Sequence, residues 1–160
     1  ELLNLAEKQN VTVWILEYAI NLTIGCILIL ATYTNARSIE DPEGENYIPL
    51  APDFTMTGGL SIKNDKGFSG SIKYRYIDDR PANEDNSIVA DGYLVTDLGA
   101  NYTFNNIKLG LVIENLFDTE WNETQFATES RLQNEVQPVE EIHFTPGTPF
   151  FIKGSITYKF

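Results

Sequence analysis

The sequence predicts an all-β protein, a meander of antiparallel strands with one apolar and one polar face. Three observations predict this fold class. Apolar and polar side chains alternate over segments as long as a membrane-spanning strand, several segments end in aromatic residues, and the connections are in turn very short and very long. Together these features are typical of a transmembrane β-barrel. Alternation alone would also fit a half-buried strand of a soluble protein.

The C-terminal residues show the alternation most clearly, because successive side chains on a strand point to opposite faces. Residues 94–104 and 107–116 repeat the pattern, and about two residues around Asn105 join them, which predicts a tight hairpin. In the last strand one face carries Phe150, Ile152, Gly154, Ile156, Tyr158 and Phe160, and the other carries Phe151, Lys153, Ser155, Thr157 and Lys159. The last strand therefore has both lysines on one face.

The N-terminal part, residues 1–34, is atypical. After polar residues 1–10, residues 11–33 are apolar with a single charge at Glu17, which is long enough for a membrane-spanning helix. Their β-branched and aromatic content and Gly25 favour two strands instead, and a buried helix is a third alternative. As strands, they would place on one face Ile20, Leu22, Ile24, Cys26, Leu28, Leu30 and Thr32.

Residues 35–160 form the second predicted unit. It begins with a proline-rich loop at 35–52, followed by strands at 53–63 and 68–77 that Asn64-Asp65-Lys66-Gly67 joins as a turn. Lys73 and Arg75 share a face of the second strand. Because each would cost roughly 2 to 4 kcal/mol at the centre of a lipid bilayer, this polar face must line the lumen or a covered surface.

Acidic residues outnumber basic ones by 23 to 11, and the net charge of −12 argues against a nucleic-acid partner. Sixteen of the 23 fall in three predicted long loops, which places the negative charge at one rim. These residues are Glu40, Asp41, Glu43, Glu45, Asp78, Asp79, Glu84, Asp85, Asp91, Asp118, Glu120, Glu123, Glu129, Glu135, Glu140 and Glu141. The group at 78–86 is the best candidate for a hard cation, but its spacing fits no calcium loop, and we predict no metal site.

Catalytic chemistry is not predicted. His143 and Cys26 are the only residues of their types, so neither a nucleophile–histidine pair nor a thiolate metal centre can be assembled. Aromatic residues in the loops are candidate ligand contacts, and the alternative is that they pack the loops on one another. The candidate ligand-binding residues are Tyr47, Trp121, Phe126 and His143.

Four motifs resemble the C-terminal end of TonB-dependent outer-membrane receptors. They are Tyr-Ile-Pro-Leu-Ala-Pro at 47–52, Gly-Tyr-Leu-Val-Thr-Asp-Leu-Gly-Ala-Asn-Tyr at 92–102, Glu-Asn-Leu-Phe-Asp at 114–118 and the final Tyr-Lys-Phe. The resemblance implies the last six or seven strands of a barrel of about 22 strands with a plugged lumen. It also implies TonB-driven uptake of a scarce solute such as a ferric siderophore across the outer membrane of a Gram-negative bacterium, with no cofactor.

The resemblance assigns roles to two further groups of residues. Lumenal charges would pair with the plug domain or with one another: Lys73, Arg75, Asp97, Lys108, Glu114 and Lys153. Tyr158 and Phe160 would be the signal that the barrel-assembly machinery reads, and the apolar face would contact outer-membrane lipid.

Two expectations concern the extent of the chain. No plug domain, TonB box or signal peptide is visible, and six or seven strands cannot close so large a barrel without leaving unpaired edges in lipid. We therefore expect a segment of a larger receptor. The alternative is a soluble β-sandwich or lipocalin-like module that binds a small ligand.

Overall fold

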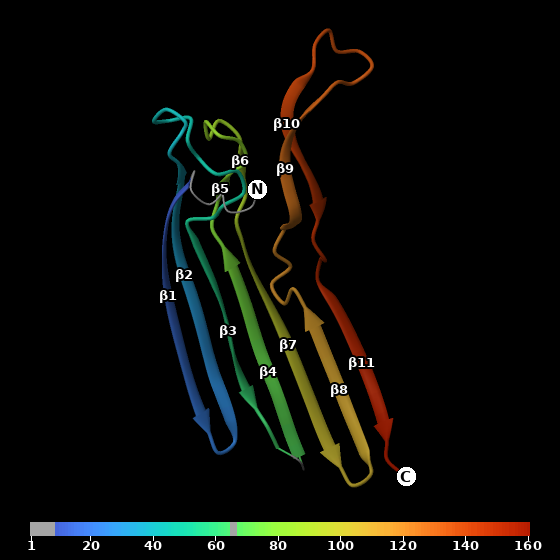
Figure 1. The fold of residues 1–160 in the computed structure, drawn as a ribbon. Coiled ribbons are helices and arrows are strands. Elements are labelled where there is room, and N and C mark those ends of the chain that lie inside the picture. The colour runs from blue at the N-terminus through green and yellow to red at the C-terminus, as the bar shows by residue number, and fades with distance from the viewer. Residues whose placement is uncertain (1–8, 65–66) are drawn as a thin grey trace.

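The computed structural model describes residues 9–64 and 67–160, and its main feature is one seven-stranded antiparallel sheet with two short two-stranded sheets beyond one end (Figure 1). Residues 1–8 of the polar N-terminal stretch and the centre of the turn predicted at 64–67 lie outside the described residues. The strands are β1 Gln9–Leu22, β2 Gly25–Ser38, β3 Phe54–Ile62, β4 Gly67–Ile77, β5 Arg80–Pro81, β6 Val89–Ala90, β7 Tyr93–Phe104, β8 Ile107–Glu114, β9 Asn122–Ser130, β10 Val139–Pro146 and β11 Phe151–Tyr158.

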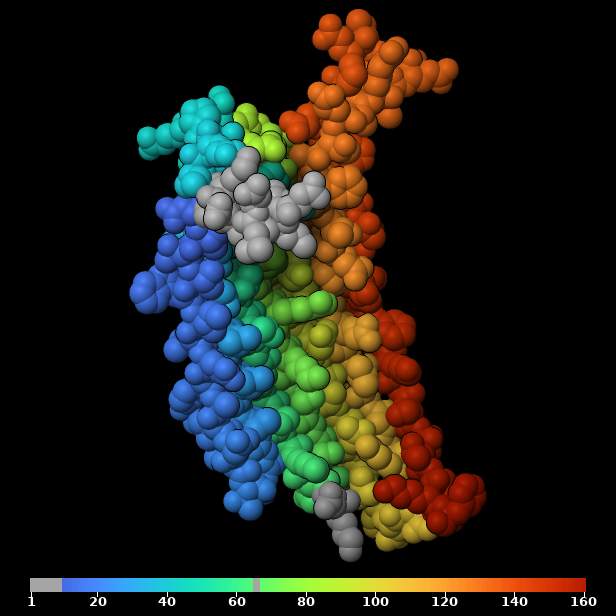
Figure 2. Space-filling model, in the orientation of Figure 1, coloured from blue at the N-terminus to red at the C-terminus, as the bar shows by residue number. Residues whose placement is uncertain are grey.

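The order of the large sheet is β1-β2-β3-β4-β7-β8-β11, with every neighbouring pair antiparallel. This is the meander that the alternation predicts, and the fold class is confirmed. The short hairpins β5–β6 and β9–β10 interrupt the sequence at the end of the sheet that we call the outer end, and β9–β10 extends furthest beyond it (Figure 2).

The register explains why one face of the sheet is apolar. A single row that crosses all seven strands consists of Ile20, Ile27, Leu60, Ile72, Leu98, Ile113 and Ile152. Aromatic residues border this band on the same face. Those toward the outer end are Trp14, Tyr33, Phe54 and Tyr76, and those toward the opposite end are Phe68, Tyr102, Phe104 and Tyr158. An apolar band with an aromatic belt at each end matches the lipid-facing surface of a barrel.

Residues 11–33 lie in the β1–β2 hairpin, whose two-residue turn joins Leu22 to Gly25. The predicted common face of Ile20 to Thr32 is wrong. Ile20 pairs with Ile27, so the alternation changes phase at the turn, and Cys26 and its alternate neighbours point to the opposite face. β2 also continues through the predicted loop start at residue 35. Among the described residues, no helix is long and apolar enough to span a membrane.

Two of the three long segments predicted as loops contain strands, so this prediction is wrong in part. Residues 78–91 contain β5–β6, and residues 118–149 contain the eight-pair hairpin β9–β10. Burial is concentrated at this end. Among the described residues, the buried apolar side chains are Ala36, Ala82, Ala90 and Val95, and the buried polar ones are Arg80, Asn83, Thr96, Asn115 and Gln125. A soluble sandwich would bury a large apolar core instead.

Candidate functional site

A cavity of about 620 Å³ lies on the polar face of the sheet near its outer end. Strands β4, β7 and β8 supply its wall, and the connection before β9 supplies its upper rim. Its charged and aromatic lining residues are Lys73, Tyr74, Arg75, Asp97, Glu114, Trp121 and Glu123. The structure therefore brings together four of the six charges that the sequence assigned to the lumen.

The remaining two predicted lumenal charges lie on the same face but outside the cavity. Lys108 stands opposite Thr103 and Thr157 in the register, and Lys153 stands opposite Val112. Lys108 lies near the opposite end of the sheet, whereas the row of Lys153 continues through Val112 and Gly99, which line the cavity. All six charges therefore share the polar face, as the alternation predicted.

The charges that line the cavity are not neutralised by one another. Lys73 stands opposite Asp97 in the register, but no ion pair within 4 Å involves either residue among the part of the chain that the structure describes. Arg75 has neutral cross-strand neighbours, Thr57 on one side and Val95 on the other. The cavity thus presents cations and carboxylates that are open to an external partner.

Trp121 closes the outer side of this cavity. The Arg75 guanidinium carbon lies 4.8 Å from the centroid of the indole, and the Tyr93 ring centroid lies 4.9 Å from it. The indole Nε1 donates a hydrogen bond to the Thr148 carbonyl at 3.0 Å, and the Gly147 amide donates to the Trp121 carbonyl at 2.8 Å. Trp121 therefore joins the sheet to both ends of the β9–β10 hairpin.

Asn115 follows β8 directly and fixes the strand end. Its side chain is 1% exposed, and its φ of 50° is a left-handed conformation that asparagine tolerates. Its Nδ2 donates to the carbonyls of Thr119 at 2.8 Å and Thr148 at 3.1 Å, and its Oδ1 accepts from the Thr119 amide at 2.9 Å. The Asn115 amide itself donates to the Asp97 carboxylate at 3.0 Å.

A second cavity, of about 710 Å³, lies at the outer end beside the first. Its lining includes Asp91, Asp118, Glu120, Trp121 and Phe144. Trp121 lines both cavities, so this side chain stands between an acidic outer space and the mixed-charge lumenal space.

Polar contacts connect the two outer hairpins. Gln125, 4% exposed, accepts a hydrogen bond from the Asp91 amide at 3.0 Å and donates one to the Asp91 carbonyl at 2.7 Å. Buried Asn83 donates to the Glu140 carboxylate at 3.4 Å, and buried Arg80 donates to the Asp91 carbonyl at 3.4 Å. The hairpins are therefore joined through satisfied buried groups.

Tyr47 takes part in packing within the loops. The Arg37 guanidinium lies 4.4 Å from its ring centroid, and the Tyr47 amide donates to the Glu84 carbonyl at 3.0 Å. Leu50 adds a second backbone hydrogen bond, to the Pro81 carbonyl at 2.7 Å. Tyr47 thus holds the 39–53 connection against the β5–β6 hairpin.

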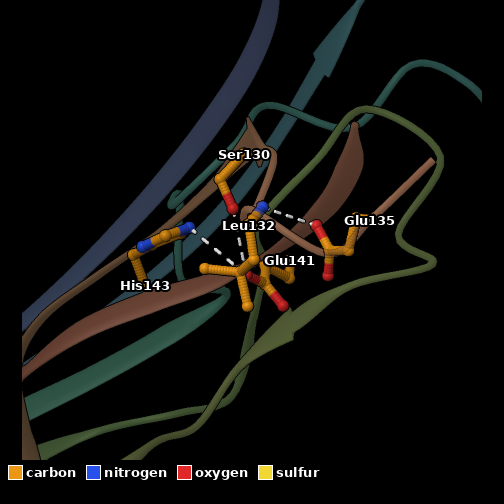
Figure 3. Close-up of polar contacts among 5 residues, drawn as sticks. All are labelled: Ser130, Leu132, Glu135, Glu141 and His143. Carbon is orange, nitrogen blue, oxygen red and sulfur yellow. Dashed lines mark hydrogen bonds and ion pairs between the residues drawn. The ribbon is translucent and has the colours of Figure 1, made fainter. Parts of the chain in front are cut away.

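Phe126 and His143 stand opposite each other on β9 and β10, with stacked rings 5.9 Å apart. His143 Nε2 lies 3.9 Å from the Glu141 carboxylate, which also accepts a hydrogen bond from the Ser130 hydroxyl at 3.0 Å (Figure 3). Phe126 is 46% exposed. The structure therefore brings these two candidates together on one face of the hairpin, separate from Tyr47 and Trp121.

The acidic group at 78–86 forms turns. The Asp79 carboxylate accepts from the Gly92 amide at 2.6 Å, and the Asp85 carboxylate accepts from the Ser87 hydroxyl at 2.7 Å and the Ser87 amide at 3.0 Å. The two Ser87 hydrogen bonds, the hydroxyl first, hold the pKa of Asp85 below its ordinary value. Within residues 9–64 and 67–160, no group of three or more His, Cys, Asp or Glu is placed to hold a metal ion.

Sequence reasoning did not assign roles to Asn115, Gln125 or Thr148. Asn115 carried a signal, since it directly follows a strand and begins the Asn-Leu-Phe-Asp motif. Gln125 lies in a polar stretch that alternation does not mark, and Thr148 contributes only its backbone carbonyl. A carbonyl carries no sequence signal, because every residue has one.

The structure defines the class of protein. A sheet with an apolar, belted face and a polar face that lines a cavity is the wall of a transmembrane β-barrel. A family model described as "TonB dependent receptor-like, beta-barrel" matches residues 9–116, and the chain belongs to this family. The family is one of receptors and not of enzymes. The match confirms the predicted resemblance to TonB-dependent receptors and the prediction that the protein is not an enzyme.

Two solved structures show the same fold. The ferric yersiniabactin uptake receptor FyuA from Yersinia pestis superposes with a TM-score of 0.65 at 14% identity, over 95% of this chain and 24% of the receptor. The ferric citrate transporter FecA, in its unliganded form, superposes with a TM-score of 0.56 at 15% identity, over 83% and 21%. The chain thus spans about a quarter or less of each. No curated protein sequence matches it.

Proposed function

We propose that the chain is part of an outer-membrane receptor of a Gram-negative bacterium, which takes up a scarce solute such as a ferric siderophore with energy delivered by TonB. The observation that carries this proposal is the pairing of a lipid-type face with a lumenal face whose charges are not neutralised within the sheet. In water, a large apolar outer surface with aromatic belts would be an exposed hydrophobic patch, which soluble proteins rarely carry. The two structural neighbours are named for ferric uptake, which supports the choice of solute class.

The lumenal charges are proposed to contact a plug domain. Lys73, Arg75, Asp97 and Glu114 line one cavity, and Lys108 and Lys153 extend the charged surface along the same face. Charges of both signs favour a folded polar partner over a single small ion, because each sign needs its own counterpart.

The ligand contacts are proposed to lie at the outer end. Trp121 lines both cavities, and Phe126 with His143 offers a stacked aromatic surface on the outer hairpin. Tyr47 would act by holding the 39–53 connection in place beneath the Arg37 guanidinium. Aromatic faces suit a solute that carries planar or apolar groups.

Tyr158 and Phe160 are proposed as the assembly signal. Their rings meet edge to face at 5.3 Å, and the Asn106 side chain donates to the Lys159 carbonyl at 2.8 Å between them. Both aromatic side chains are exposed, which leaves them open to the barrel-assembly machinery.

The test is uptake by cells of the natural host. Deletion of the gene should abolish accumulation of radiolabelled iron from at least one siderophore in a panel, complementation should restore it, and a protonophore should block it. The protein should sediment with the outer membrane. Recovery in the soluble fraction, or uptake of every solute at the wild-type rate after deletion, would contradict the proposal.

A site variant sharpens this test. Phe126→Ala should weaken solute binding, since it removes the ring that stacks on His143. Leu132→Ala is the matched control, because Leu132 is an exposed apolar residue (63% exposed) just beyond the same strand and takes no part in the stack of Phe126 on His143. Equal affinity in the two variants would remove Phe126 from the proposed ligand contacts.

A further inference from the structure

Arg75 is a lumenal cation with no charged partner on its own sheet. Its cross-strand neighbours Thr57 and Val95 are uncharged, whereas Lys73 faces Asp97. No hydrogen bond or ion pair joins the Arg75 side chain to any other residue that the structure describes, and its one close partner is the face of Trp121. The guanidinium therefore lies over the face of a ring, and no other described residue accepts a hydrogen bond from its N–H groups.

This arrangement fits a carboxylate. A guanidinium presents its N–H donors in a planar fork that matches the two oxygens of a carboxylate. Stacking on the indole leaves that edge free and restricts its orientation. Arg75 also lines the lumenal cavity, so a carboxylate that reaches it comes from the lumen.

Trp121 links Arg75 to both legs of the β9–β10 hairpin. It directly precedes β9, and its indole and carbonyl bind Thr148 and Gly147, which follow β10. A side chain on Gly147 would overlap the indole ring, so the two are in intimate contact. Whatever restrains the indole therefore restrains the base of the hairpin.

We propose that Arg75, held face-on by Trp121, binds an Asp or Glu carboxylate of the domain that fills the lumen, and that Trp121 conveys this contact to the β9–β10 hairpin by ordering its base. The inference rests on the proposed function, because it takes the lumenal partner from there. It adds the chemistry of the group that Arg75 binds and a mechanical route from the lumen to the outer surface.

The partner group is tested in the full-length receptor purified from outer membranes. Arg75→Lys introduces an amine that a carbodiimide can couple to a carboxylate in direct contact, and peptide mapping identifies the joined residue. We expect one new linkage, absent from the wild type, to a carboxylate outside residues 1–160. Thr103→Lys, on the same face but outside the cavity, is the control and should not join that residue.

Two results would overturn this part. The first is coupling of the new lysine only to Asp97, Glu114 or Glu123, which would make the partner internal to this chain. The second is no coupling at all. Heat-modifiable migration of the variant in gels confirms that it folds. If the wild type is not recovered from outer membranes or does not transport, the proposed function fails; if it transports and the linkage is absent, only the present inference fails.

The coupling to the hairpin is tested by hydrogen exchange. Arg75→Gln should raise the exchange rate of the Gly147 amide by about tenfold, because loss of the stacked cation frees the indole. Lys73→Gln, which removes a charge from the same strand face without touching Trp121, should change it less than about twofold. Equal rates in both variants would overturn the coupling.

Discussion

Asn115 shows how much a single side chain can do at the end of a strand. Its side chain makes three hydrogen bonds to backbone groups that lie beyond the end of β8, where the ladder of strand hydrogen bonds stops. These bonds connect Thr119 with Thr148, which lie on opposite legs of the long outer connection. Leu116 then donates to the Thr96 carbonyl at 2.7 Å, so the chain stays attached to the sheet as it leaves it. The site is therefore built from a polar anchor and not from an apolar core.

Asn115→Ala is expected to destabilise the protein by about 2–4 kcal/mol, because it removes three hydrogen bonds made by a fully buried side chain, two to the Thr119 backbone and one to the Thr148 carbonyl. The measurement is denaturant-induced unfolding in detergent micelles. Asn105→Ala is the matched control: Asn105 has a similar φ of 53° but is exposed, so the change should cost only the backbone strain of about 1–2 kcal/mol. Similar losses in both variants would show that the side-chain hydrogen bonds contribute little.

Asp85 gives a prediction about pH. The Ser87 hydroxyl and amide lower the pKa of Asp85 in the folded protein. The ionised carboxylate therefore stabilises the 83–88 turn fully above the ordinary pKa of aspartate, and this stabilisation is lost as the pH falls through the lowered pKa. Ser87→Ala should move the pKa of Asp85 upward in a carboxyl-carbon NMR titration. Ser87→Thr keeps the hydroxyl and should leave the pKa low. An unchanged pKa in the alanine variant would refute this assignment.

Sequence reasoning predicts which face a residue occupies far better than what it touches. The faces of Lys73, Asp97 and Lys153 follow from a period of two once the strand is recognised. The stack of Arg75 on Trp121 joins residues 46 positions apart, and no local pattern encodes it. The same holds for Phe126 and His143, whose pairing depends on the register of a hairpin within a predicted loop.

At the scale of elements, the two outer hairpins behave as a joined pair. Gln125 on β9 makes both of its hydrogen bonds to the backbone of Asp91, just after β6. This amide-to-backbone pairing reproduces one rung of a β-ladder between segments that are not paired strands. The outer end therefore has a defined shape despite its dense negative charge.

Gln125→Ala is expected to loosen this junction by about 1–3 kcal/mol, since it removes both hydrogen bonds that the buried Gln125 side chain makes to the Asp91 backbone. Amide exchange at Asp91 and along β9 should accelerate while exchange in β7 and β8 stays constant. Thr124→Ala is the control, because Thr124 is exposed and lies on the other face of β9. Acceleration of the same size in both variants would mean that Gln125 is not the connection.

The strands of the sheet were predictable and the outer hairpins were not, for one physical reason. β3, β4, β7, β8 and β11 have one face against an apolar surrounding, which forces alternation into the sequence. β9 and β10 have polar side chains on both faces, so the same geometry leaves no periodic trace. β1 shows the reverse case, because apolar residues such as Val13 and Ile15 lie on its lumenal side and obscure the period.

At the scale of the whole molecule, the two faces of the sheet should respond in opposite ways to the same charge. Ile72→Lys places an ammonium in the apolar row, where lipid would cost it roughly 2–4 kcal/mol. Ser71→Lys places it on the adjacent lumenal position, where water or a polar partner solvates it at little cost. The measurement is the free energy of unfolding in lipid vesicles. Equal stability of the two variants would contradict the assignment of faces.

The arrangement of the connections also sets the direction in which the sheet can enter a bilayer. One end has two-residue turns at Leu22–Gly25 and Phe104–Ile107, and the other carries the three segments that hold sixteen acidic residues. Carrying one carboxylate through hydrocarbon costs about 2.5–3.5 kcal/mol, so the sixteen together exceed by far the 5–15 kcal/mol that stabilises a typical fold. Spontaneous threading of the acidic end is therefore blocked, and translocation requires a hydrated, protein-lined passage while the short turns remain on the side from which the sheet inserts.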